Sequence, residues 1–363
     1  MADEERLVKT LIELIKIDSP SGEEDAMDAE VSSRLESLGL KVSHDAYKNV
    51  IAKLDGEGEP IMLSAHLDTV EPGRGIKPVI DGGVLRSDGT TILGGDCKAG
   101  VAIVLEGLES ALATNRANRA NRAIEVIFTR HEEGGLVGAH NLDFSMVAAK
   151  KGIVFDGEGP PNRIILSAPS QNVVTAYITG RAAHAGLEPE KGISALLIAS
   201  DILSRLPLGR IDEETTANIG RMEGGLKRNI IPEQAFLDGE FRSLSNEKLA
   251  DMERKFRGAF NEVASMYPEA SINLDITNSY QAYNIDPKSS AVAIIGKALA
   301  GMGLEMILES TGGGSDANVF IEKGITAIPV GIGVRDFHTT WETALISEVM
   351  LGAQMCEGIV LGK

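Results

Sequence analysis

Cysteine is scarce in this sequence, which has only Cys97 and Cys356 among its 363 residues. Two distant cysteines make a poor disulfide framework, so we expect a protein of the reducing cytoplasm. The start, MADEERLVKT, has no basic region followed by an apolar stretch, and we therefore expect no signal peptide. No apolar run approaches the ~18 residues that a transmembrane helix needs, so we also expect no membrane-spanning segment.

Basic residues are few as well, because 35 lysines and arginines stand against 53 aspartates and glutamates, a net charge of −18. With a pI near 4.8, the chain would repel nucleic acids and anionic membranes, and neither is expected as a partner. Such an acidic surface is typical of a cytoplasmic protein. The hydrophobic content of 43% is ordinary, and 363 residues are long for one core, which favours two domains.

Hydrophobic periodicity predicts the elements of the first half of the chain. A helix is expected over residues 4–17, and Ser21 with Glu24 reads as a capping box that opens a second helix ending near Gly39. A Gly-rich loop and hairpin with a DGG turn is expected between Val70 and Gly94. The triple Asn-Arg-Ala repeat over residues 115–123 reads as a polar connector. Strands are expected at 41–46 and 50–54, and a helix at 98–112.

The pattern changes near Gln171, where a strand–helix–strand–strand–helix–strand series begins. Its members are predicted at residues 173–179, 192–206, 216–223, 233–243, 246–265 and 271–276. This series is the split βαβ pattern of a small α+β, ferredoxin-like domain. We therefore predict an α/β catalytic domain with a mostly parallel sheet, residues 1–169 and 284–363, interrupted by an inserted α+β domain, residues 170–283. We call this insertion the lid.

Acids and histidines follow short apolar runs at five places, and all five fall within the predicted α/β domain. These residues are His66, Asp96, the pair Glu132-Glu133, Asp156 and His338. The apolar runs read as buried parallel strands, and residues just past the carboxyl ends of such strands line the ligand crevice of open α/β sheets. Two histidines with several carboxylates are the ligands that zinc accepts. The sequence therefore predicts a metal-dependent hydrolase.

Each of these residues taken singly also has a purely structural interpretation. A histidine at a strand end is often just a hydrogen-bonded polar residue, and Asp96 suits the N-cap of the helix that follows it. The pair Glu132-Glu133 could place acids at a helix N-terminus, which the helix dipole favours. None of these interpretations explains why all five positions lie at strand ends in one domain. Their recurrence is what favours a metal site.

Two zinc ions ~3.5–4 Å apart would use these groups together. A bridging carboxylate is needed, and Asp96 is central in the chain order. His66 and Asp156 would complete one ion, and Glu133 and His338 the other. Neighbouring side chains of an extended segment point apart, so Glu132 would face the water as general base if Glu133 faces the metal. Asp68, two residues after His66, is expected to orient that imidazole through its second nitrogen.

At these motifs the chain resembles the dinuclear-zinc exopeptidases, the family of peptidase T, aminoacylase, glutamate carboxypeptidase and succinyl-diaminopimelate desuccinylase. The motifs, which cover nearly the whole chain in order, are SAHLDTV, GGDCKAG, TRHEEGG, VFDGEG, AAHAG, GGLKRNIIPEQA, GEFRS and STGGGSDANVF. The resemblance implies the same ligand set, Glu132 as general base, Asp68 as orienting acid and a cis peptide after Asp96. The subgroup with an aspartate at the position of Asp156 is that of peptidase T and related tripeptide aminopeptidases.

The same resemblance assigns roles in the lid. His184 matches the histidine that stabilises the tetrahedral oxyanion, and in many dimeric members a second copy of the chain supplies it. Arg242 and Asn229 match residues that hold carboxylate or carbonyl oxygens of the substrate, for which arginine is well suited. Gly313 and Gly314, in the Gly312–Gly314 run, would let the backbone approach the substrate closely.

Several alternatives stay open from the sequence. AAHAG lacks the proline that follows this histidine in peptidase T, and His131 stands where that enzyme commonly has another polar residue. The preferred function, release of the N-terminal residue of a short peptide, therefore competes with a carboxypeptidase or an N-acyl-amino-acid amidohydrolase using the same two metals. A catalytically dead homologue is disfavoured because no ligand is lost. Co²⁺ or Mn²⁺ could replace Zn²⁺, and the chain could be a monomer or a homodimer through the lid.

Overall fold

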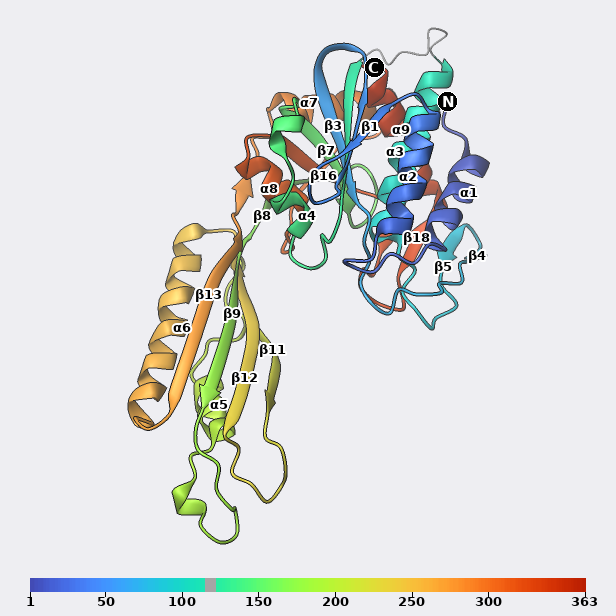
Figure 1. Ribbon diagram of the computed structural model, residues 1–363. Helices are drawn as coiled ribbons and strands as arrows, with labels where there is room; N and C mark the ends of the chain where they lie inside the picture. Colours follow the sequence, from blue (N-terminus) through green and yellow to red (C-terminus); the bar gives the residue numbers. More distant parts are fainter. Residues whose placement is uncertain (115–121) are drawn as a thin grey trace. The chain divides into compact units, whose positions relative to one another are not determined.

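The computed structural model describes residues 1–114 and 122–363, so most of the predicted Asn-Arg-Ala connector lies outside the described residues. The chain divides into two compact units (Figure 1). The first comprises Met1–Leu166, Asn284–Ser310 and Ser315–Lys363, and the second comprises Ser167–Tyr283 and Thr311–Gly314. Because the second is an insertion, the last segments of the chain rejoin the first unit.

The first unit is built on a mixed sheet with the order β1-β2-β6-β3-β7-β16-β8-β14, and β15 pairs with β8. Its centre, β6-β3-β7-β16, is parallel, whereas β1-β2, β2-β6 and β16-β8 are antiparallel. The strands are β1 (Lys41–His44), β2 (Val50–Leu54), β3 (Glu57–His66), β6 (Arg122–Thr129), β7 (Lys151–Gly157), β8 (Arg163–Ala168), β14 (Tyr283–Asn284), β15 (Ile307–Ser310) and β16 (Thr326–Gly331). The central strands are buried along most of their length, as parallel strands covered on both faces must be.

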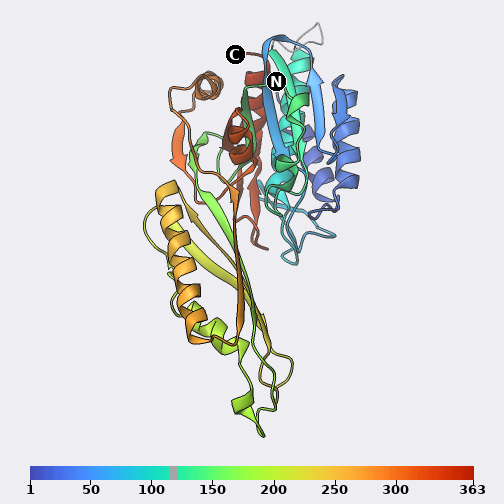
Figure 2. The same cartoon turned by 60° about the vertical axis from the view of Figure 1, so that its left-hand side comes forward.

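Helices surround this sheet. The long apolar helix α3 packs on β3 and β7, and both α1 and α9 pack on α3. On other parts of the sheet α2 packs on β1 and β2, and α8 packs on β16 (Figure 2). The helices are α1 (Glu4–Ile15), α2 (Asp25–Ser37), α3 (Gly95–Thr114), α4 (Val137–His140), a 3₁₀ turn at Phe144–Met146, α7 (Ser290–Gly301), α8 (Asp316–Glu322) and α9 (Ile346–Val360). No helix among the described residues is long and apolar enough to span a membrane.

A small second sheet, β17-β18-β5-β4, completes the unit. Its strands are β4 (Val79–Asp81), β5 (Val84–Arg86), β17 (Val334–Arg335) and β18 (Thr343–Leu345). The antiparallel pair β4-β5 confirms the predicted hairpin, whose turn residues Gly82 and Gly83 both have positive φ. The predicted capping box is wrong, because α2 starts at Asp25 with Glu24 as N-cap and no side-chain cap. Ser21 and Glu24 have other partners, described below.

The second unit is an antiparallel sheet of order β10-β11-β12-β9-β13, with α5 and α6 on one face (Figure 1). Its elements are β9 (Ser170–Thr179), a 3₁₀ turn at Pro189–Lys191, α5 (Ala195–Leu203), β10 (Gly209–Arg210), β11 (Thr215–Gly224), β12 (Gln234–Ser243), α6 (Asn246–Met266) and β13 (Ser271–Tyr280). Every second residue of β9, such as Val174, Ala176 and Ile178, faces the two helices in one apolar core. The predicted fold class, a mostly parallel α/β domain with an inserted ferredoxin-like α+β domain, is thus confirmed.

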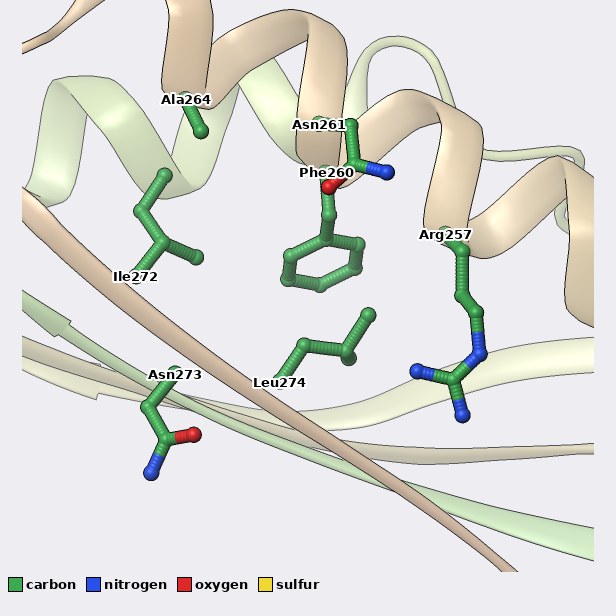
Figure 3. Close-up of a pocket in the computed structure, with 7 residues that line it drawn as sticks. All are labelled: Arg257, Phe260, Asn261, Ala264, Ile272, Asn273 and Leu274. Atoms are coloured by element: carbon green, nitrogen blue, oxygen red, sulfur yellow. The ribbon is translucent and has the colours of Figure 1, made fainter.

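A pocket lies between α6 and the edge strand β13 of this second unit (Figure 3). Its lining consists of Arg257, Phe260, Asn261, Ala264, Ile272, Asn273 and Leu274. These side chains include no carboxylate, histidine or cysteine. The pocket therefore offers neither metal ligands nor an acid–base pair, and the reactive groups gather elsewhere.

Candidate metal centre

The predicted ligands meet at one edge of the first unit's sheet. His66 is the last residue of β3, Asp156 lies near the end of β7, and Glu132-Glu133 follow β6. These strands are parallel neighbours, so their carboxyl ends lie side by side. Asp96 stands at the start of α3 with non-helical φ/ψ (−80°, 106°). The Asp96–Cys97 peptide is cis, as the family resemblance implies.

His66 faces two carboxylates at the first half of this centre. Its Nε2 lies 3.2 Å from Asp96 Oδ1 and 3.4 Å from Asp156 Oδ1. Its Nδ1 lies 3.0 Å from the main-chain carbonyl of Asp68. A carbonyl only accepts, so Nδ1 carries a proton and Nε2 presents its lone pair to the carboxylates in the neutral ring. All three side chains are nearly buried, which is the setting of a bound cation rather than of a surface cluster.

His338 forms the second half, and Asp96 belongs to both. His338 Nε2 lies 3.1 Å from Asp96 Oδ2 and 2.9 Å from Glu133 Oε1. The two histidines therefore approach different oxygens of one carboxylate. In each triad, His66–Asp96–Asp156 and Asp96–Glu133–His338, the ligand atoms lie within 4.8 Å of one another. Three donors around each position, with one carboxylate shared, fit a pair of divalent cations.

The protonation of these groups reflects an excess of buried negative charge. Hydrogen bonds with Asp96 and Glu133 raise the pKa of His338 to about 10. Burial opposes ionisation of Asp96, but His338 and His66 together lower the pKa of that carboxyl. Burial raises the pKa of Glu132 well above its ordinary value. Cationic charge is what this cluster attracts, and a metal ion supplies it more compactly than protonated histidines.

Asp68 is tied to the main chain beside the glutamate pair more closely than to His66. Its Oδ1 accepts the N–H of Glu132 at 2.8 Å and its Oδ2 accepts the N–H of Glu133 at 3.1 Å. The distance from Oδ1 to His66 Nδ1 is 3.4 Å, longer than that from the Asp68 carbonyl. The side chain of Asp68 therefore holds the two glutamates in place, and its carbonyl does most of the orienting of His66.

Ser21 and Glu24, expected to cap a helix, support this same loop instead. The Ser21 hydroxyl donates to Asp68 Oδ2 at 2.6 Å. Glu24, which is fully buried, accepts the N–H of His131 at 3.0 Å and two N–H groups of Arg130 at 3.0 and 2.8 Å. A capping motif and a site-supporting pair use the same residue types, so the sequence alone offered no signal to separate them.

Two further buried groups flank the ligands and were not singled out by the sequence patterns. The Cys97 thiol donates to the Phe155 carbonyl at 2.7 Å and lies within 4.8 Å of the ligand atoms of the first triad. Asp316, 2% exposed, accepts the hydroxyl of Thr129 through Oδ2. Its Oδ1 is buried and has no hydrogen-bond partner among the described residues. Burial raises the pKa of Asp316 to about 7.

The predicted substrate-binding residues all lie in the second unit. His184 and Asn229 are both exposed. Their loops lie side by side, because Ala185 N–H donates to the Asn229 carbonyl at 3.1 Å. Arg242 on β12 places Nε and Nη2 on the two oxygens of Glu240 at 2.8 and 2.9 Å. Gln171, its cross-strand neighbour, donates to the same carboxylate. The positive charge of Arg242 is therefore largely compensated within the unit.

Arg242 also reaches the glycine run, since its Nη1 lies 3.4 Å from the Gly312 carbonyl. Gly313 N–H donates to Thr311 Oγ1 at 3.2 Å. A Cβ on Gly314 would stand 2.2 Å from Tyr280 Cζ, so only glycine fits there. Arg242 pairs with Gln171 at one end of β9, whereas Gln234 pairs with Thr179 at the other. The eight residue steps from Gln171 to Thr179 span about 26 Å, so Arg242 and the His184 loop lie at opposite ends of the sheet.

Comparison with known proteins shows to which family this chain belongs. Residues 172–268 match the model of the peptidase dimerisation domain of M20 enzymes, and residues 49–195 match that of peptidase family M28. A Bacillus subtilis protein of uncharacterised function, YqjE, is 40% identical over 371 residues, which cover 99% of each chain. The chain belongs to the M20 family of metallo-exopeptidases. The resemblance inferred from the sequence motifs is thus confirmed.

Solved structures of M20-type peptidases share the whole fold with this chain. Aminopeptidase PepT from Bacillus cereus has a TM-score of 0.86 and 36% identity, with 99% of both chains covered. A tripeptidase from Staphylococcus aureus has a TM-score of 0.90 and 32% identity, covering 99% of this chain and 98% of the other. Because the matches cover nearly the whole of this chain, both of its compact units have counterparts in these structures.

Proposed function

We propose that this M20 peptidase is a two-zinc aminopeptidase that removes the N-terminal residue from short peptides, tripeptides among them. The observation that carries the proposal is the pair of ligand triads sharing Asp96, with 3.2 and 3.1 Å from its two oxygens to His66 and His338. The names of the relatives, an aminopeptidase and a tripeptidase, support the direction of cleavage. Co²⁺ and Mn²⁺ suit the same histidine and carboxylate donors.

In this proposal residues 1–169 and 284–363 form the metal-binding catalytic domain and residues 170–283 form the lid. His66, Asp96 and Asp156 would hold one ion, and Asp96, Glu133 and His338 the other. Bound zinc polarises a carbonyl oxygen and lowers the pKa of coordinated water. Glu132 would take a proton from the attacking water and deliver it to the leaving nitrogen, because its burial raises its pKa toward the working range. Asp68 would keep Glu132 and Glu133 in register through their N–H groups.

The surroundings of Arg242 suggest which substrate oxygen it would bind. Glu240 already occupies two of its N–H groups and compensates its charge. A neutral peptide carbonyl is then a better partner than a second carboxylate, which Glu240 would repel. The backbone at Gly313 and Gly314 would complete the contacts beside Arg242, and Asn229, on the loop next to His184, would reach the same peptide from a second copy of the chain. A site of this kind suits an aminopeptidase better than an enzyme that must recognise a free C-terminal carboxylate.

His184 would stabilise the oxyanion in a homodimer formed through the lid. Arg242 lies at one end of the sheet, and the His184 loop follows the other end, about 26 Å further along β9. A tripeptide, extended, covers only about 10 Å. If both residues serve one substrate, His184 must therefore come from a second copy of the chain. The match of residues 172–268 to a peptidase dimerisation domain supports this arrangement, and β13 offers an open strand edge for pairing.

A paired assay on the zinc-reconstituted enzyme tests the proposal. It compares the tripeptide Ala-Ala-Ala with its N-acetylated form and identifies the products by mass spectrometry. Cleavage of the free peptide alone, with release of the first residue, supports an aminopeptidase. Release of the last residue from both peptides would overturn it in favour of a carboxypeptidase. Release of acetate from the blocked peptide would instead indicate an N-acyl amidohydrolase.

A further inference from the structure

Glu342 is a buried carboxylate that contacts the centre without being one of its ligands. It is 1% exposed and lies four residues after His338. Its Oε1 accepts the N–H of Asp96 at 2.8 Å, and its Oε2 accepts the N–H of Gly94 at 2.8 Å. Glu342 N–H donates to the Thr339 carbonyl at 3.2 Å, which closes a turn directly after His338. One side chain thus joins the two segments that carry Asp96 and His338.

Burying the Glu342 carboxylate costs free energy, which indicates that this side chain has a specific role. A carboxylate removed from water loses several kcal/mol of hydration, which main-chain N–H donors replace only in part. Here the two donors, Gly94 N–H and Asp96 N–H, lie at the start of α3, where Asp96 has non-helical φ/ψ. The next residues, Thr343–Leu345, are held as β18 between β17 and β5. Glu342 therefore stands directly before a strand that is paired on both sides, and fixes the main chain of Asp96 from there.

We propose that Glu342 is a positioning residue that sets the separation of Asp96 and His338, and with it the affinity for the metal ion these two residues share with Glu133. The inference rests on the proposed two-metal function. Outer groups that orient metal ligands typically change metal affinity by about 10–100-fold when removed. Glu342 differs from such groups because it acts at two places at once. It holds the main chain of Asp96, and it closes the turn that follows His338.

The chain offers a matched control in Glu125. This carboxylate is 3% exposed and also accepts two main-chain N–H groups, those of Ala148 and Ala149 at 2.9 and 2.8 Å. Among the described residues its partners are these two N–H groups and Lys53, none of them one of the five proposed ligands. Glu125→Gln and Glu342→Gln therefore both weaken a buried carboxylate clamp, but only the second change touches the metal centre.

The experiment measures binding of Co²⁺ and Zn²⁺ to the metal-free full-length variants by titration calorimetry and Co²⁺ absorption. The His338→Ala variant identifies which of the two binding events belongs to the ion held by His338, because that event is the one it loses. We expect Glu342→Gln to weaken that ion by about 10–100-fold, while Glu125→Gln keeps wild-type affinity for both ions. Affinities within about twofold of wild type in Glu342→Gln, or an equal loss in Glu125→Gln, would overturn the inference. If wild type itself binds no metal, the proposed function fails instead.

Folding and the local turn are checked separately. Circular dichroism melting of the metal-free proteins shows whether each variant folds, and Glu342→Asp serves if Glu342→Gln does not. The chain has a single tryptophan, Trp341, which is 79% exposed and adjacent to Glu342. Its fluorescence anisotropy reports the order of this turn. We expect the anisotropy to fall in Glu342→Gln, together with the metal affinity, and to stay unchanged in Glu125→Gln. If neither the anisotropy nor the affinity changes in Glu342→Gln, the proposal is contradicted.

Discussion

The carboxylate of Asp68 accepts the main-chain N–H of Glu132 at 2.8 Å. Asp68, two residues after His66, thereby fixes the main chain of Glu132, the proposed general base, although 64 residues separate the two in the chain. The hydroxyl of Ser21 holds Asp68 from the other side. The position of the proposed base is thus set by residues outside the proposed ligand set.

Glu132→Ala is expected to retain both metal ions and to lose roughly 10²–10⁴-fold in kcat, because only the proton-transferring group is removed. The Glu132 side chain belongs to neither proposed triad, although its carboxylate lies within 4.8 Å of the ligand atoms of His66 and Glu133. Metal content by mass spectrometry and kcat on a tripeptide are measured together. Turnover near the wild-type rate would refute the role of Glu132, and loss of metal would show that it is a ligand.

Arg242→Lys should lower kcat/KM on short peptides by roughly tenfold, because lysine keeps the charge but loses the planar fork that Glu240 and Gly312 hold in place. Arg221→Lys is the matched control, since Arg221 forms a similar exposed pair with Glu223 on the neighbouring strand β11. The control should behave as wild type. Equal kinetics for the two variants would remove Arg242 from the substrate site.

Mixing two inactive variants tests whether His184 acts across a dimer. His184→Ala and Arg242→Ala each damage every site of their own homodimer. In a randomly mixed dimer, one of the two sites would combine an intact Arg242 with an intact His184 from the other copy, so about a quarter of the wild-type activity should return. Activity is measured after the two proteins are unfolded and refolded together. No recovery, with dimers shown by light scattering, would place both residues in one chain's own site.

Asp316 should make the metal-free protein less stable as the pH rises. Burial raises its pKa from 3.8 to about 7, so between these values the folded protein binds more protons than the unfolded chain. Its stabilising contribution is complete below about pH 4 and is lost by about pH 7. Asp316→Asn removes this difference and should flatten the dependence by up to about 4 kcal/mol.

Urea unfolding of wild type and Asp316→Asn across this pH range measures the effect. The neighbouring groups that interact with Asp316 are His66, Asp68 and Asp156. They are present in both proteins, so the difference between the two curves reports Asp316 together with the change that its charge imposes on these neighbours. Parallel curves would show that the buried carboxyl titrates as in the unfolded chain.

The sequence by itself predicted which acids and histidines come together in this protein, because they stand directly after apolar runs. Parallel strands bring their carboxyl ends to one edge, so residues such as His66, Asp156 and Glu133 must meet once the runs are recognised as strands. The alternating pattern from Val173 onward predicted the inserted antiparallel sheet in the same way. In both cases a local period carries the information.

Only the tertiary structure decided which groups support these ligands. Ser21 and Glu24 have the spacing of a helix cap, yet they bind Asp68 and Arg130. In the sequence Glu342 has no feature that distinguishes it from other acids in polar loops. Only the structure shows that it accepts the N–H of Asp96, 246 residues earlier in the chain. Such contacts join distant segments through single hydrogen bonds, which leave no periodic trace in the sequence and form only when the segments pack together.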